Sequence, residues 1–132
     1  FDTGGKFEAS IYHAIESSVD EILPSVRPAG VKKQIEIDFV IRRGNNIGII
    51  EAKTGTNKAG IDQLDTAGNP LYTGIHLQKF LVTGRYLSNA YKSLALAQDI
   101  RVIELPGYSP EHGIPKRERH NMISTIHSTL PV

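Results

Sequence analysis

Two neighbouring stretches of the chain, 34–42 and 47–53, carry the short apolar runs that are typical of β-strands. The four residues between them, 43–46, centre on a Gly-Asn pair, which predicts a two-residue hairpin loop. Every second residue of the first stretch is apolar: Ile35, Ile37, Phe39 and Ile41. Because successive side chains of a strand point to opposite faces, this set predicts a face that is buried in the core.

The other face of the same hairpin carries charged side chains. If the Gly-Asn pair forms the loop, Asp38 lies directly opposite Glu51, and Lys53 follows on the same face. Opposed residues have their Cβ atoms about 4.5–5.5 Å apart. A register shifted by two residues would place Asp38 opposite Lys53 and would still keep all three groups together. Two carboxylates and an ammonium at this distance suit a hard, oxygen-preferring cation and the phosphate that it polarises.

The pattern elsewhere predicts helices and strands in alternation. Apolar residues at helical spacing predict a helix over 5–23 that Pro24 ends, and a first strand is expected over 26–33. Later elements are a helix from about 59 to 67, a strand over 79–83, a helix capped by Ser88, a strand over 101–105 and a helix over 116–129. The β-α-β order of 79–105 requires a parallel crossover. The sequence therefore predicts an α/β fold with a mixed sheet.

Composition bounds the class of protein. The chain has 132 residues, 39% of them hydrophobic and 22% charged, which indicates one globular domain. No apolar run approaches the length of a membrane span and no signal-peptide pattern is present, so a soluble cytoplasmic protein is expected. Without cysteine there are no disulfides or thiolate metal sites. Because the chain begins at Phe1, we expect one domain over 1–132 that is a fragment of a longer protein, or a chain that lacks its disordered start.

Positive charge is concentrated near the predicted hairpin. Residues 31–58 hold six lysines and arginines against three acids, although the whole chain has a net charge of only +1. This bias would attract phosphates. Lys32, Lys33 and Lys58 equally fit a solvated strand edge that lysines protect from pairing.

The motif Asp38 … Glu51-Ala52-Lys53, placed on two strands after a first helix, resembles the PD-(D/E)XK nuclease superfamily. The resemblance extends over residues 5–105 and implies a restriction-endonuclease-like fold, with an αβββαβ core and here an αβ extension. The segments Glu36-Ile-Asp-Phe-Val, Ile50-Glu-Ala-Lys-Thr-Gly and Lys79-Phe-Leu-Val-Thr-Gly-Arg-Tyr-Leu-Ser are most similar to the nuclease domain of CARF-linked CRISPR ancillary nucleases. This likeness implies a sensor domain, N-terminal to the segment, that binds a cyclic oligoadenylate.

The resemblance also implies roles for the hairpin residues. Asp38, Glu51 and the backbone carbonyl of Ala52 would hold Mg²⁺ or Mn²⁺, and Lys53 would orient the attacking water or stabilise the transition state. Alternatively, Asp38 and Lys53 form a cross-strand ion pair on a solvated face. Glu36 is expected to be a partner for Lys53 rather than a metal ligand.

Two residues outside the hairpin complete the predicted catalytic set. Glu8 corresponds to an acid that reaches the metal site from the first helix in many relatives, or is simply favoured near a helix N-terminus. Gln63 on the second helix would hydrogen-bond a phosphate or a water, or lies on an exposed face. Lys58 and Tyr72 are further candidates for contact with the substrate backbone. The five histidines lack the spacing of a zinc site.

These observations predict a metal-dependent endonuclease acting on DNA or RNA, as the effector domain of a CRISPR-associated cyclic-oligoadenylate sensor. The alternatives are a junction-resolving or restriction-type DNA endonuclease, and a catalytically inactive nucleic-acid-binding module on the same fold. The small net charge predicts weak binding by one copy. We therefore expect a homodimer, paired through the apolar stripe of the first or the last helix, and no membrane partner.

Overall fold

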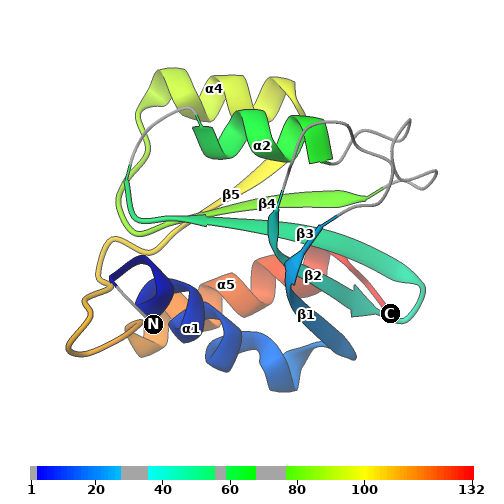
Figure 1. Ribbon diagram of the computed structural model, residues 1–132, viewed down its shortest axis with the longest axis horizontal. Helices are drawn as coiled ribbons and strands as arrows, with labels where there is room; N and C mark the ends of the chain where they lie inside the picture. The colour runs from blue at the N-terminus through cyan, green and yellow to red at the C-terminus, as the bar shows by residue number, and fades with distance from the viewer. Residues whose placement is uncertain (1–2, 28–35, 56–58, 68–76) are drawn as a thin grey trace.

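A five-stranded sheet forms the centre of the computed structural model, which describes residues 3–27, 36–55, 59–67 and 77–132 (Figure 1). The strands are β1 (Glu21–Val26), β2 (Ile37–Arg43), β3 (Asn46–Lys53), β4 (Gln78–Thr83) and β5 (Ile100–Glu104), in that spatial order. The first three strands pair antiparallel, and β3, β4 and β5 pair parallel. The predicted mixed sheet, including the parallel β4–β5 crossover, is confirmed.

Helices cover both faces of this sheet. In the view of Figure 1, α2 (Ala59–Ala67) and α4 (Asn89–Ala97) lie on what we call the upper face. The lower face carries α1 (Thr3–Ile15) and α5 (Lys116–Thr129). A separate hydrophobic cluster fills each side. These helices match the predicted ones over 59–67 and 116–129, and Ser88 caps α4 as predicted by accepting a hydrogen bond from the Tyr91 N–H.

The β2–β3 hairpin has the predicted register. Its pairing runs from Phe39–Ile50 to Arg43–Asn46, so the alternative shifted by two residues is excluded. Gly44 is the first loop residue and has φ 58°, a left-handed conformation that glycine adopts without steric cost. The predicted apolar face is buried at Phe39 and Ile41. Ile37 is also buried, but in the cluster on the opposite side of the sheet, and Ile35 lies outside the described residues.

The end of the chain packs against the hairpin turn. Arg43 donates hydrogen bonds to the carbonyl oxygens of Leu130 (2.7 Å) and His127 (3.1 Å). A Cβ at Gly48 would lie 2.9 Å from Phe80 Cε2 and 3.2 Å from a methyl of Leu130, so only glycine fits there. The turn is thereby held against the last residues of the chain.

The N-terminal segment differs from the prediction. The helix predicted over 5–23 ends at Ile15 and is followed by a 3₁₀ turn at Glu16–Ser18. The first strand is Glu21–Val26, whereas it was expected over 26–33, of which 28–33 lie outside the described residues. Serines favour the end of a helix because their hydroxyls compete for backbone groups. Pro24 does not end the helix but lies in β1, an edge strand, where a missing N–H is tolerated.

The apolar stripes of α1 and α5 are not free to pair with a second copy. Each is buried beneath the sheet: Phe7, Ile11 and Ile15 on α1, Met122 and Ile126 on α5. The dimer surface predicted on these helices is therefore wrong, because the sheet itself covers the stripes. In the part of the chain that the structure describes, no helix is long and apolar enough to cross a membrane.

Candidate active site

Glu51 and Lys53 lie at the carboxyl end of β3, on the upper face of the sheet. Glu51 is 3% exposed, and its Oε1 lies 3.3 Å from the Lys53 ammonium. Among the described residues, Glu51 and Thr83 are the only buried polar or charged ones. A charged side chain buried at this point of a sheet is costly unless it has a function or a full set of partners.

Asp38 completes the group from the neighbouring strand. Its Oδ2 accepts a hydrogen bond of 2.8 Å from the backbone N–H of Ala52, which fixes the carboxylate against β3. Its carboxyl group is also hydrogen-bonded to that of Glu51. In an extended strand the N–H and C=O of one residue point to the same edge. The Ala52 carbonyl therefore faces the side on which Asp38 lies.

Burial raises the pKa of both carboxyl groups. The pKa of Glu51 is raised to about 8, mainly by burial; the negative charge of Asp38 adds to the rise and Lys53 opposes it. Burial also raises the pKa of Asp38, although the Ala52 N–H counteracts it. Additional positive charge next to the pair would therefore favour the ionised form of both groups. Oxygen donors of this kind, with a backbone carbonyl beside them, fit Mg²⁺ or Mn²⁺.

Helix α2 packs closely over the lysine. A Cβ at Gly60 would lie 2.7 Å from a methyl of Leu81 and 3.1 Å from Lys53 Cγ, so the absence of a side chain lets the helix approach. The Lys53 side chain is 32% exposed, which leaves its ammonium accessible. Glu36 does not take the predicted role of partner for Lys53: the structure pairs Glu36 with Arg27 at 3.4 Å. The cause is the position of β1, which the sequence did not predict.

Gln63 lies one turn after Gly60 on α2 and so follows it on the same side of the helix. Its Oε1 is buried and has no hydrogen-bond partner among the described residues. A buried acceptor without a donor costs free energy, about 1–3 kcal/mol. The amide is therefore a group to which a water or a substrate would contribute a missing hydrogen bond.

Glu8 occupies a different place. It lies on α1, beneath the sheet, and lines a cavity of about 330 Å³ together with Tyr12, Pro24 and Phe39. Asp38 and Phe39 are neighbours in β2 and point to opposite faces, so this cavity is not the space around the acid pair. Participation of Glu8 in the site stays a prediction. Lys32, Lys33, Lys58 and Tyr72 lie outside the described residues.

Within the described ranges, no three or more His, Asp or Glu side chains gather in a way that could hold a metal ion. The candidate donor set is therefore two carboxylates and a main-chain oxygen.

Sequence reasoning missed two residues, Arg85 and Tyr86, in the turn that begins beside Lys53. They follow β4 directly, and the N–H of Gly84 donates a 2.9 Å hydrogen bond to the Lys53 carbonyl. Both side chains are exposed. The position of this turn depends on the parallel pairing of β4 with β3, which places the two strand ends side by side. The sequence alone does not predict that pairing.

No protein-family model matches the chain, and no curated protein sequence does. Several solved structures share its fold. Can2 from Sulfobacillus thermosulfidooxidans, in complex with cyclic tetra-adenylate, superposes with a TM-score of 0.70 at 18% identity, over 98% of this chain and 36% of that chain. EndoMS in a complex with double-stranded DNA matches with a TM-score of 0.57 at 18% identity, over 85% of this chain and 46% of that one.

The small subunit of the heterodimeric restriction endonuclease R.BspD6I matches with a TM-score of 0.51 at 10% identity, over 91% of this chain and 77% of the subunit. The chain thus spans about a third of the Can2 chain and less than half of the EndoMS chain. The fold is a mixed α/β sheet flanked by helices, of the restriction-endonuclease-like kind.

Proposed function

We propose that this domain is a metal-dependent nuclease that hydrolyses phosphodiester bonds of DNA or RNA. The observation that carries the proposal is the convergence of Asp38, Glu51 and Lys53 at one end of the sheet, with both carboxyl groups kept from free ionisation by burial. Two of the structural neighbours support the choice of substrate: one is bound to double-stranded DNA and the other is part of a restriction endonuclease.

Asp38, Glu51 and the Ala52 carbonyl would hold Mg²⁺ or Mn²⁺. When bound, the ion supplies a water that ionises near neutral pH and offsets the charge that develops on the phosphate. The Ala52 N–H keeps the Asp38 carboxylate in place through its 2.8 Å hydrogen bond. Lys53 directs its ammonium at the attacking water or at a phosphate oxygen, and Gln63 positions one of the two through its amide. The Lys53 ammonium lies 3.3 Å from Glu51 Oε1, which keeps it at the acid pair.

Replacement of the lysine tests the proposal. We expect Lys53→Ala to lower cleavage of labelled oligonucleotides in Mg²⁺ or Mn²⁺ by about 10²–10³-fold, the usual loss when one group that stabilises transition-state charge is removed. The matched control is Lys116→Ala, an exposed lysine at the start of α5, on the other side of the sheet. A Lys53→Ala protein that cuts at the wild-type rate would show that the acid pair and lysine are a structural ion pair.

We further propose that the domain is the effector part of a longer protein with an N-terminal sensor domain. The support is the likeness to Can2 in complex with cyclic tetra-adenylate, of which this chain spans about a third. Such an effector acts as a homodimer whose two copies share the phosphate contacts that one weakly charged copy lacks. Cleavage per domain should then rise with protein concentration, and size-exclusion chromatography over the same dilution series should show dimerisation. A monomer with concentration-independent specific activity would refute this arrangement.

A second candidate is a junction-resolving or restriction-type endonuclease on duplex DNA, which the likeness to DNA-bound EndoMS favours. A substrate panel separates the two. Preference for duplex or branched DNA without any effect of cyclic tetra-adenylate on the longer protein identifies the second candidate. Binding without cleavage of any substrate identifies an inactive nucleic-acid-binding module.

A further inference from the structure

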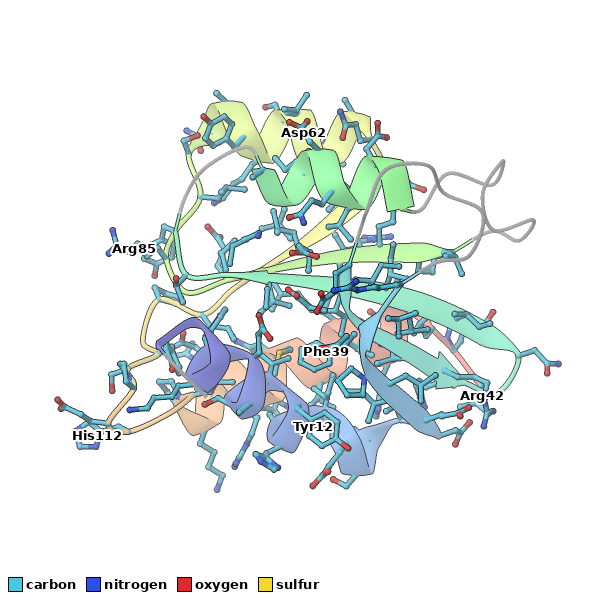
Figure 2. The ribbon with its side chains drawn as sticks, in the orientation of Figure 1. Tyr12, Phe39, Arg42, Asp62, Arg85 and His112 are labelled. Carbon is cyan, nitrogen blue, oxygen red and sulfur yellow. The ribbon has the colours of Figure 1, made fainter. Side chains whose placement is uncertain are left out.

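The turn after β4 exposes a cationic and an aromatic side chain at two consecutive positions. Tyr86 is 71% exposed, which makes it one of four large hydrophobic residues that the described part of the chain leaves exposed. Arg85 points away from the body of the protein at the edge of the molecule in Figure 2. Within the described ranges, no carboxylate forms an ion pair with Arg85.

This exposure does not come from a loose loop. On one side of the pair, Thr83, itself 1% exposed, donates a 2.7 Å hydrogen bond from its hydroxyl to the Arg85 carbonyl. On the other side, the Leu87 N–H donates to Glu104 Oε2 at 2.7 Å, and the Leu87 side chain is buried. The backbone is therefore fixed before and after the two exposed side chains. Rigid presentation lowers the entropy that a ligand contact costs.

The turn begins beside the proposed catalytic lysine. Thr83 pairs with Lys53 across β4 and β3, and Gly84 donates a hydrogen bond to the Lys53 carbonyl. Neighbouring strands are about 4.8 Å apart. A nucleic acid whose phosphate lies over Asp38, Glu51 and Lys53 therefore extends across this turn if it leaves the site on the β4 side.

We propose that Arg85 and Tyr86 form a binding subsite for a single-stranded segment of the substrate, next to the scissile phosphate. Arg85 pairs with a backbone phosphate through its planar guanidinium, and Tyr86 stacks on the adjacent base. A single strand is inferred because the bases of a duplex are already stacked on one another and offer no free face. The inference rests on the proposed nuclease function and deepens it, since it specifies which strands the site accepts.

Binding measurements test the subsite in a Lys53→Ala background, in Mg²⁺, so that the oligonucleotide stays intact. Fluorescence anisotropy with a mixed-sequence single strand should show that Tyr86→Ala weakens binding about tenfold. Tyr86→Phe, which keeps the ring, should stay within about twofold of the parent. Arg85→Ala should weaken binding and lower the slope of log affinity against log salt by about one phosphate contact, whereas Tyr86→Ala leaves the slope unchanged. The controls are Arg101→Ala and Leu96→Ala, both exposed residues elsewhere on the surface.

The outcomes separate this subsite from the nuclease function. If Arg85→Ala and Tyr86→Ala bind as the controls do while Lys53→Ala abolishes cleavage, the subsite is wrong and the nuclease stands. If Tyr86→Ala weakens duplex binding as much as single-strand binding, the stacking assignment is wrong. If no substrate is ever cut but the two variants lose affinity as expected, the subsite stands on an inactive module.

Discussion

The two faces of the sheet bury different kinds of side chain. The lower face packs apolar side chains against α1 and α5, and the described members of its cluster are hydrophobic throughout, with Phe7, Phe80 and Met122 at most 1% exposed. The upper face begins in the same way, with Ile49 and Leu81 buried under α2. It ends in a buried glutamate, its lysine and an amide oxygen without a donor.

The difference indicates that residues that stabilise the fold and residues of the candidate site lie on opposite faces of the sheet. Apolar burial on the lower face contributes stabilisation that does not depend on pH or metal. The carboxyl end of the upper face instead keeps groups whose burial is unfavourable in the metal-free domain. A variant on the lower face should therefore affect folding alone, and one at the upper strand ends should affect activity, metal binding or pH dependence.

Phe39→Ala should have the largest effect on stability. Phe39 lies between the sheet and Tyr12 of α1, as Figure 2 shows, and is 3% exposed. Emptying a buried aromatic position costs roughly 3–5 kcal/mol of unfolding free energy. Urea denaturation would measure the loss, and Tyr86→Ala is a matched control because that ring is exposed. A Phe39→Ala domain as stable as the wild type would contradict the division between the faces.

The metal-free domain should lose stability as pH rises. The pKa of Glu51 is about 8 in the folded state against an ordinary 4.5, so the folded protein binds the proton more tightly than the unfolded chain does. The free energy of unfolding therefore falls between pH 4.5 and about 8 and levels off above that, and Asp38 contributes in the same direction. Thermal unfolding in EDTA should show a falling melting temperature over this range, and Glu51→Gln should remove most of the slope.

Adding Mn²⁺ tests whether the buried carboxyl groups bind a metal ion. At pH 8 the ion should raise the melting temperature of the wild type, because it favours the ionised carboxyl groups, and should raise that of Glu51→Gln much less. If both proteins respond alike, the ion binds elsewhere. If the wild-type melting temperature rises from pH 5 to pH 8 relative to Glu51→Gln, the assigned direction of the pKa shift is wrong.

Gln63→Leu should give the smallest change in stability, and in the opposite direction. Replacing a buried acceptor that lacks a donor with an apolar group of similar size should stabilise the metal-free domain by about 1 kcal/mol. Cleavage should fall about tenfold, within the usual loss for one positioning hydrogen bond. Gln98→Leu is the matched control, since its Oε1 is also buried without a partner but lies at the end of α4. Equal effects of the two substitutions on cleavage would exclude a role for Gln63.

The central hairpin was predictable because its determinants are local. A Gly-Asn loop and an alternating apolar face set the register, and the register alone places Asp38 opposite Glu51 with Lys53 beside them. The later helices and strands were predictable for the same reason, since the spacing of apolar residues is local and Ser88 marks the start of α4.

The N-terminal strand and the surroundings of the site were not predictable in this way. Val19 and Ile22 fit a helical stripe equally well, and only pairing with β2 draws 21–26 into the sheet. Glu36 then meets Arg27 instead of Lys53. The apolar stripes of α1 and α5 were visible in the sequence, but what covers them was not. The turn that carries Arg85 and Tyr86 begins beside Lys53 only because β3 pairs in parallel with β4, which joins residues about thirty positions apart.

The two-residue hairpin loop also limits how this domain can tolerate insertions and deletions. Adding or removing a single residue at Gly44 or Asn45 while keeping the apolar face of β2 in the core shifts β3 by one position against β2. The alternation then turns Ile50 toward Asp38 and Glu51 into the lower core. A change of two residues restores the faces but moves Glu51 away from its position opposite Asp38. Length variation in such domains should therefore accumulate outside this turn, and a library of loop lengths at Gly44-Asn45 should retain folded, active members only at the natural length.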